Sequence, residues 1–98
     1  MRKNVHLNII ILLMNAFLTK KIKGNFFEKE YLKRLRYIRD NEIRFESEIE
    51  GVLSDIWCDV DAFVFDAKLY DPDEGDIDEI ELRRRVKLNL KKLKELIK

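Results

Sequence analysis

The side chains that could do chemistry in this chain are nearly all carboxylates, and they are concentrated in one stretch. Residues 55–81 contain eleven Asp and Glu and a single basic residue, Lys68, so these 27 residues carry a net charge of −10. Carboxylates at this density can bind a cation, act as an acid–base pair or attract a positively charged partner. Residues 1–44 and 82–98 each carry a net charge of +7, so a formal total of +1 conceals a strongly polarised chain.

Calcium binding is the first function that the acidic stretch suggests, because it is expected as a loop between two helices. If Gly75 is aligned with the obligatory glycine of an EF-hand loop, Tyr70 and Pro72 occupy positions that require oxygen ligands. The single histidine, His6, and the single cysteine, Cys58, also provide too few ligands for a structural zinc site. We therefore expect no metal site and no cofactor.

Enzymatic activity is not expected either. The three glycines are scattered and form no phosphate-binding loop, and no Ser–His or Cys–His pairing is suggested by the sequence. The carboxylates are expected on exposed helix faces and loops, where nothing would separate their pKa values. A lone cysteine excludes an internal disulfide, which fits a reducing compartment such as the cytoplasm. The chain is expected to be a cytoplasmic binding protein and not an enzyme.

The elements that position these carboxylates are predicted to be helices, because apolar residues recur at helical spacing along nearly the whole chain. The pattern predicts helices over 5–22 and 26–39, a third from Ser47 to about residue 66, and a fourth that opens after Asp76. Gly24 is expected in a left-handed turn after the first helix. Three capping boxes are expected, and they pair the following residues: Asn25 with Glu28, Ser47 with Glu50, and Asp76 with Glu79.

Apolar stripes on these helices predict how they pack. The third helix is expected to bury Ile49, Leu53, Ile56, Val60, Phe63 and Val64, and the fourth Ile80, Leu82, Val86, Leu90, Leu93 and Ile97. The apolar run 9–14 is too short to cross a bilayer and is expected to be part of a core helix. The sequence thus predicts an all-α fold, an antiparallel four-helix bundle in which residues 1–98 form a single domain.

The helical spacing also predicts where the acidic residues lie. Glu48, Asp55, Asp59 and Asp66 are expected on one exposed strip of the third helix, which continues into an acidic loop. Glu79 and Glu81 precede Arg83 and Arg85 by four residues, a spacing that favours ion pairs within the fourth helix. The basic residues 83–94 are interpreted as the solvated face of that helix, so no direct binding to nucleic acid is expected.

Three segments of the chain resemble a known family. The segment from Leu53 to Phe63 (LSDIWCDVDAF), the segment from Asp76 to Leu82 (DIDEIEL) and the earlier stretch from Phe27 to Leu32 (FEKEYL) are similar to the colicin D-type, bacterial self-protective immunity proteins. The resemblance implies a four-helix bundle that neutralises a basic nuclease toxin domain, one that cleaves transfer RNA and is delivered as a bacteriocin or by contact-dependent inhibition. Its acidic side chains would take the place of the phosphates of the substrate in the active-site groove.

The same resemblance suggests which residues contact the toxin. The candidates are the acidic residues Asp55, Asp59, Asp61, Asp66, Asp71, Asp73, Glu74, Asp76 and Asp78. The expected partner is a protein, bound by a monomer in a 1:1 complex, with no role for a membrane. The alternative from a different class is an acidic helical module for protein interaction or self-assembly without any toxin.

Overall fold

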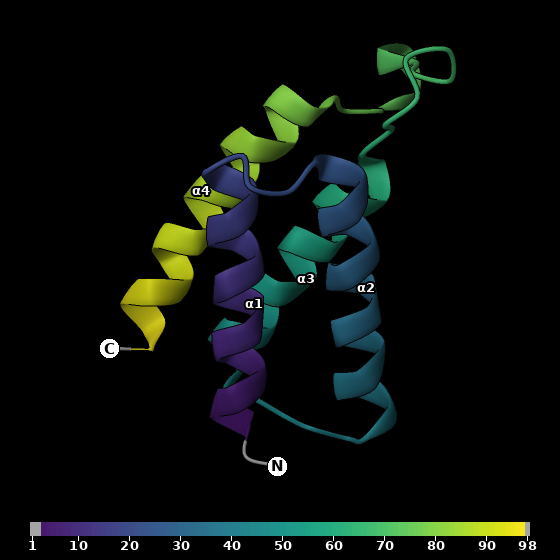
Figure 1. Cartoon of the computed structure of the whole chain (residues 1–98). Coiled ribbons are helices and arrows are strands. Elements are labelled where there is room, and N and C mark those ends of the chain that lie inside the picture. Colours follow the sequence, from purple (N-terminus) through teal and green to yellow (C-terminus); the bar gives the residue numbers. More distant parts are fainter. Residues whose placement is uncertain (1–2, 98) are drawn as a thin grey trace.

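The computed structural model describes residues 3–97 as a bundle of four helices. They are α1 (Lys3–Leu18), α2 (Gly24–Asp40), α3 (Ser47–Ala62) and α4 (Glu79–Leu96), with a short 3-10 helix, η1 (Pro72–Glu74), in the α3–α4 connection. Successive helices run in opposite directions along the bundle (Figure 1). Within the described residues there is no strand, and the prediction of an all-α helical bundle is confirmed.

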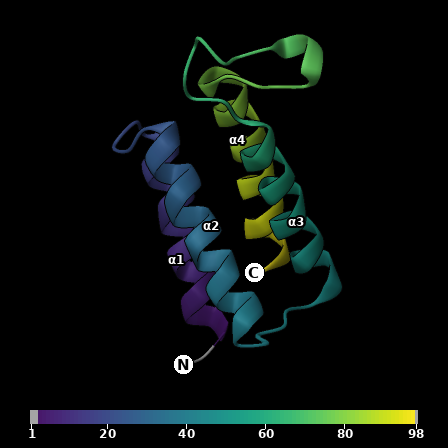
Figure 2. The same cartoon turned by 90° about the vertical axis from the view of Figure 1, so that its right-hand side faces the viewer.

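The helices are arranged as a ring with one weak seam. α1 packs between α2 and α4, and α3 packs on α4, whereas α2 and α3 touch each other much less. Figure 2 shows α1 with α2 on one side of the bundle and α3 with α4 on the other. The seam between α2 and α3 therefore stays partly open over much of its length.

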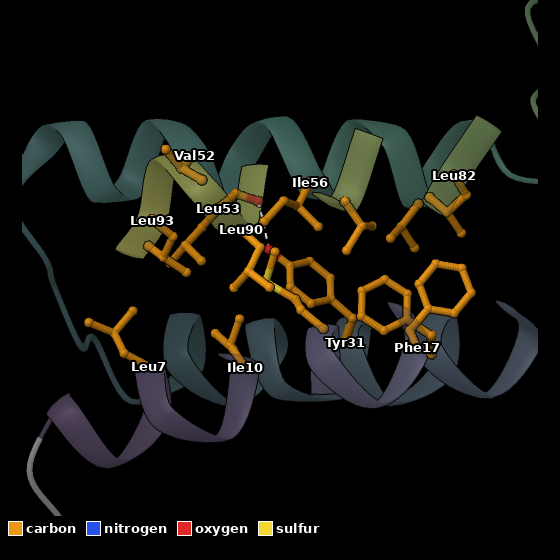
Figure 3. Packing of buried hydrophobic residues seen from close by; sticks show 14 of the residues in the cluster. Leu7, Ile10, Phe17, Tyr31, Val52, Leu53, Ile56, Leu82, Leu90 and Leu93 are labelled. Carbon is orange, nitrogen blue, oxygen red and sulfur yellow. Dashed lines mark hydrogen bonds between the residues drawn. The ribbon is translucent and has the colours of Figure 1, made fainter. Parts of the chain in front are cut away.

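The core is built from aromatic residues at one end and aliphatic residues along the rest of the bundle. The Phe17 and Phe27 rings stack with centroids 4.7 Å apart, and Tyr31 continues the stack at 5.6 Å from Phe27. The buried Tyr31 hydroxyl donates a hydrogen bond to the Leu53 carbonyl at 2.9 Å, which joins α2 to α3 across the weak seam (Figure 3). Burial of Tyr31, together with the charge of Asp59, raises the pKa of the phenol, so the hydroxyl remains a donor.

Two residues that the sequence analysis placed in the core are exposed. Ile80 is 79% exposed and Ile97 is 38% exposed. Ile80 lies about 200° around α4 from the buried Leu82, on the solvated side, and Ile97 follows the last helical residue. The remaining expected core residues of α4 are buried: Leu82, Val86, Leu90 and Leu93.

The connection between α1 and α2 differs from the prediction. α1 ends at Leu18, and the left-handed residue that follows it is Lys20 (φ 64°), not Gly24. Gly24 is the first residue of α2, whose N-cap is Lys23 without any side-chain cap, so the predicted Asn25–Glu28 capping box is wrong. Glycine is needed at position 24 for space, because an added Cβ would lie 2.6 Å from the Phe63 ring and 2.7 Å from Glu79.

The third helix ends earlier than predicted. It stops at Ala62, and Phe63 adopts an extended conformation (φ −73°, ψ 131°). Phe63 forms an isolated parallel bridge with Ile77, in which the Val64 N–H donates to the Ile77 carbonyl at 3.1 Å and the Ile77 N–H donates to the Ala62 carbonyl at 2.9 Å. The run Phe63-Val64-Phe65 favours extended backbone, and this pairing competes with the helix. Asp66 consequently lies in the loop and not on α3.

The helix caps of α3 and α4 also differ from the predicted boxes. Glu46, not Ser47, is the N-cap of α3, and the Glu50 carboxylate reaches back to the Phe45 N–H at 3.2 Å. At α4 the N-cap is Asp78, whose carboxylate accepts from the Glu81 N–H at 2.9 Å. The predicted Asp76 box is therefore wrong by two residues, because Asp76 is used within the loop.

Candidate binding surface

The structure places the nine candidate residues in two groups. Asp55, Asp59 and Asp61 lie on α3, and the others lie in the connection to α4: Asp66, Asp71, Asp73, Glu74, Asp76 and Asp78. Because α3 runs toward this connection, Asp61 and the loop lie at the same end of the bundle, whereas Asp55 lies near the middle of the helix (Figure 1). α3 itself carries five acidic residues and no basic one.

The spacing predicted that Asp59 lies on an exposed strip of the third helix, and this prediction is wrong. Asp59 is largely buried against α4. Its carboxylate accepts from the Arg85 guanidinium at 3.0 Å and from the Asn89 amide at 3.4 Å, and its side chain is only 16% exposed. Asn89 is buried, so it places a polar group at the α3–α4 contact.

The expected ion pairs within α4 are present. Glu79 pairs with Arg83 at 2.7 Å and Glu81 with Arg85 at 2.8 Å, and Arg84 adds a second contact to Glu81 at 2.6 Å. Hydrogen bonds from Arg84 and then Arg85 lower the pKa of the Glu81 carboxyl to about 2. These glutamates stabilise α4, as the sequence predicted.

Glu79 and Arg83 also join three helices at the loop end of the bundle. The Glu79 carboxylate accepts from the Gly24 N–H at 2.6 Å, so it caps the start of α2. The Arg83 guanidinium donates to the Phe17 carbonyl at 3.2 Å, near the end of α1, and lies 4.7 Å from the centroid of the Phe17 ring. This end of the bundle is therefore a fixed base for the loop.

Three of the loop aspartates and the α4 N-cap bond to backbone amides of nearby residues. Asp66 accepts from the Lys68 N–H at 2.9 Å, Asp71 from the Asp73 N–H at 3.0 Å, and Asp76 from the Asp71 N–H at 2.9 Å. Such side-chain bonds to amides a few residues away hold turns in place. Asp66 and Asp71 thus have a local structural role that was not predicted for them, and Asp78 caps α4.

In four of the nine candidates the side-chain carboxylate makes no hydrogen bond or ion pair with the residues that the structure describes. They are Asp55, Asp61, Asp73 and Glu74, and all four are exposed. Asp61 is close enough to Glu28 that its charge, after the burial of Glu28, helps to raise the pKa of the Glu28 carboxyl. The structure therefore separates four carboxylates that are free to meet a partner from five that shape the fold.

The sequence analysis missed the exposed apolar residues of the same loop. Phe65 is 54% exposed, Leu69 72% and Tyr70 36%, and Ile80 follows at the start of α4. The signal was available, because Phe65, Leu69 and Tyr70 lie outside any helical stripe and between acidic residues. At the loop end of the bundle, the acidic surface therefore also contains exposed apolar side chains.

A groove follows the weak seam between α2 and α3. It is a groove of about 980 Å³ whose floor includes Leu32, Leu35 and Leu53, with the 48% exposed Trp57 at its edge. Its rim mixes both signs of charge, with Arg36, Arg39 and Arg44 facing Glu42, Glu50 and Asp61. This groove has no net electrostatic preference, unlike the loop.

The described residues show neither a cluster of metal ligands nor a membrane-spanning helix. Across the described residues, no three His, Cys, Asp or Glu side chains come together in a way that could hold a metal ion. None of the described helices combines the length and the apolar character that crossing a membrane requires.

The protein is thus a small four-helix bundle with a strongly acidic surface that is partly apolar at its loop end. Residues 5–93 match the model of the family described as bacterial self-protective colicin-like immunity, and the chain belongs to this family. Membership implies that the chain binds a cognate toxin protein and protects the cell that makes it. No curated protein and no solved structure matches the chain.

Proposed function

We propose that this chain neutralises a nuclease toxin, of the class that cleaves transfer RNA, by filling its basic active-site groove with carboxylates in place of phosphates. The observation that carries the proposal is the set of four exposed carboxylates without an internal partner: Asp55, Asp61, Asp73 and Glu74. The proposal includes a 1:1 complex in the cytoplasm, where the RNA substrate of such a toxin is found.

Electrostatics support a basic partner. Residues 55–81 concentrate a net charge of −10, and like charges at this density destabilise a compact state unless an opposite charge compensates them. A groove shaped for nucleic acid supplies that charge, because it must neutralise phosphates. Complementary charge also raises association rates toward ~10⁸–10⁹ M⁻¹s⁻¹ at low salt, which suits an inhibitor that must act before its toxin does.

The proposal gives different roles to the two groups of acidic residues. In the proposal Asp55, Asp61, Asp73 and Glu74 make direct contacts with basic side chains of the toxin. Asp59, Asp66, Asp71, Asp76 and Asp78 contribute to the negative potential, while their hydrogen bonds maintain the surface. Neutralising a residue of the first group should weaken binding without loss of stability, and neutralising one of the second should affect both.

The test needs the cognate toxin, which we expect to be the C-terminal domain of a large secreted protein encoded immediately upstream of this chain, and it uses that domain as a catalytically inactive variant. Asp55→Asn with Asp61→Asn should raise the dissociation constant by about 100-fold, since each substitution removes a charge that the proposal pairs with a basic side chain of the toxin. The matched control, Asp40→Asn with Glu95→Gln, also removes two negative charges, but from exposed positions elsewhere. It should change the dissociation constant by less than about threefold. Equal effects of the two double variants would show that only net charge matters and refute the site.

A second measurement tests phosphate mimicry separately from binding. A fluorescently labelled transfer RNA bound to the inactive toxin domain should be displaced by one equivalent of this chain. A stable ternary complex would show that the chain binds outside the groove. Absence of any binding to the toxin domain, with salt-reversible self-association seen by light scattering, would support the assembly module instead.

A further inference from the structure

We infer that the loop of residues 64–76 anchors the chain in its partner through apolar side chains, with its carboxylates as a surrounding rim. This inference rests on the proposed function, because the partner is taken to be the basic groove of the toxin. It adds a second kind of contact, which electrostatic mimicry does not require.

The first support is the exposure of apolar side chains at the loop. Phe65, Leu69 and Tyr70 lie within six residues and are 54%, 72% and 36% exposed. Turn residues in water are normally polar, so three large apolar side chains here have no local justification. Tyrosine is enriched among the residues that contribute most to binding at protein interfaces, and burying exposed phenylalanine and leucine side chains in a pocket is favourable through the hydrophobic effect.

The second support is that the loop is held in shape by the protein itself. Its ends are joined by the Phe63–Ile77 bridge, and its interior is fixed by the turns that Asp66, Asp71 and Asp76 cap. Gly75, with φ 89°, takes the left-handed conformation that closes η1. A preorganised loop loses little conformational entropy on binding, so its apolar contacts translate into affinity.

The third support is the charge around the apolar residues, which selects the partner. The loop contains Asp66, Asp71, Asp73, Glu74 and Asp76 against Lys68, a net charge of −4. An apolar centre inside a charged rim is the usual anatomy of a specific protein interface. A negative rim is repelled by anionic lipid, so it disfavours a membrane and favours a basic protein surface.

The position of the loop agrees with this role. It projects beyond the ends of α3 and α4, with η1 at its outer part (Figures 1 and 2). A projecting element can enter a concave groove, whereas the outer faces of the helices can only lie across it. The carboxylates of α3 would then contact the rim of the same groove.

The experiment compares two leucines of similar exposure on the free chain. Leu69→Gln removes an apolar side chain from the loop, and the control Leu12→Gln removes one that is 67% exposed on α1. Binding to the inactive toxin domain is measured by surface plasmon resonance at ~0.05 M and ~0.5 M salt, which changes the screening of charges several-fold. Circular dichroism melting checks that both variants remain folded.

Leu69→Gln should raise the dissociation rate constant by about 10- to 100-fold at both salt concentrations, because an apolar contact is not screened. Leu12→Gln should leave it within about twofold, and Phe65→Gln should behave like Leu69→Gln. An unchanged dissociation rate for Leu69→Gln, while Asp55→Asn with Asp61→Asn still weakens binding, would overturn this inference and leave the proposed function standing. Failure of the unaltered chain to bind the toxin domain would overturn both.

Discussion

Two glycines in this bundle should respond in opposite ways to the same substitution. Both Gly24 and Gly51 are helical and lack the positive φ that would require glycine. A Cβ at Gly51 would meet nothing within 4 Å, whereas one at Gly24 would lie 2.6 Å from Phe63 and 2.7 Å from Glu79. Replacing glycine by alanine inside a helix gains about 0.5–1 kcal/mol when there is room for the methyl group.

Gly51→Ala should therefore increase the free energy of unfolding by about 0.5–1 kcal/mol. In Gly24→Ala the new methyl group would displace the buried Phe63 ring and the Glu79 carboxylate, and overpacking of this kind costs about 1–3 kcal/mol. The gain in helix propensity offsets only part of this cost, because position 24 lies in the first turn of α2. The free energy of unfolding of Gly24→Ala should therefore be about 1–2 kcal/mol lower than that of the unaltered chain.

The assay is urea denaturation of both variants, followed by far-ultraviolet circular dichroism. For a domain of this size 1 kcal/mol corresponds to about 4–8 °C in melting temperature, so thermal scans should separate the two variants clearly. If Gly24→Ala were as stabilising as Gly51→Ala, the close packing of α2 against Phe63 and Glu79 would be wrong.

The remaining predictions concern buried and partly buried polar groups. His6 is buried with no hydrogen-bond partner for either ring nitrogen among the described residues, and burial, followed by the charge of Arg34, lowers its pKa below the ordinary 6.5. Since the unfolded chain then takes up the proton first, the free energy of unfolding should fall as the pH drops below 6.5. His6→Phe should reduce this change in the urea midpoint, and an unchanged pH profile would contradict the reasoning. A double-mutant cycle with Asp59→Asn and Arg85→Gln should give a coupling of about 0.5–1.5 kcal/mol, and additive effects would show that their 3.0 Å ion pair contributes nothing. Tyr31→Phe should cost about 0.5–1.5 kcal/mol by calorimetry through its bond to the Leu53 carbonyl, and equal stability would mean that this bond is not formed in solution.

The sequence was sufficient for the fold class because amphipathic stripes long enough to pack are local features of the chain. It failed where a distant contact decided the outcome. The end of α3 depends on pairing of Phe63 with Ile77, and the place of Asp59 depends on Arg85, twenty-six residues later. No local spacing encodes such a pairing.

Some of the candidate site could have been refined from the sequence. Asp71 before Pro72, with Gly75 following, is a turn pattern, and it indicated that Asp71 would bond to nearby backbone. The ion pairs of Glu79 and Glu81 were predicted correctly because their spacing of four residues is a helix property. The free carboxylates became evident only once the internal partners of the other acidic residues were known.

The bridge between Phe63 and Ile77 makes the acidic loop a replaceable unit. The chain leaves the bundle and returns to it at adjacent points, so residues 64–76 can change in length or sequence while α3 and α4 keep their spacing. If this loop recognises the toxin, as we infer, a graft of another loop between these two residues should change the partner while the four-helix bundle is kept.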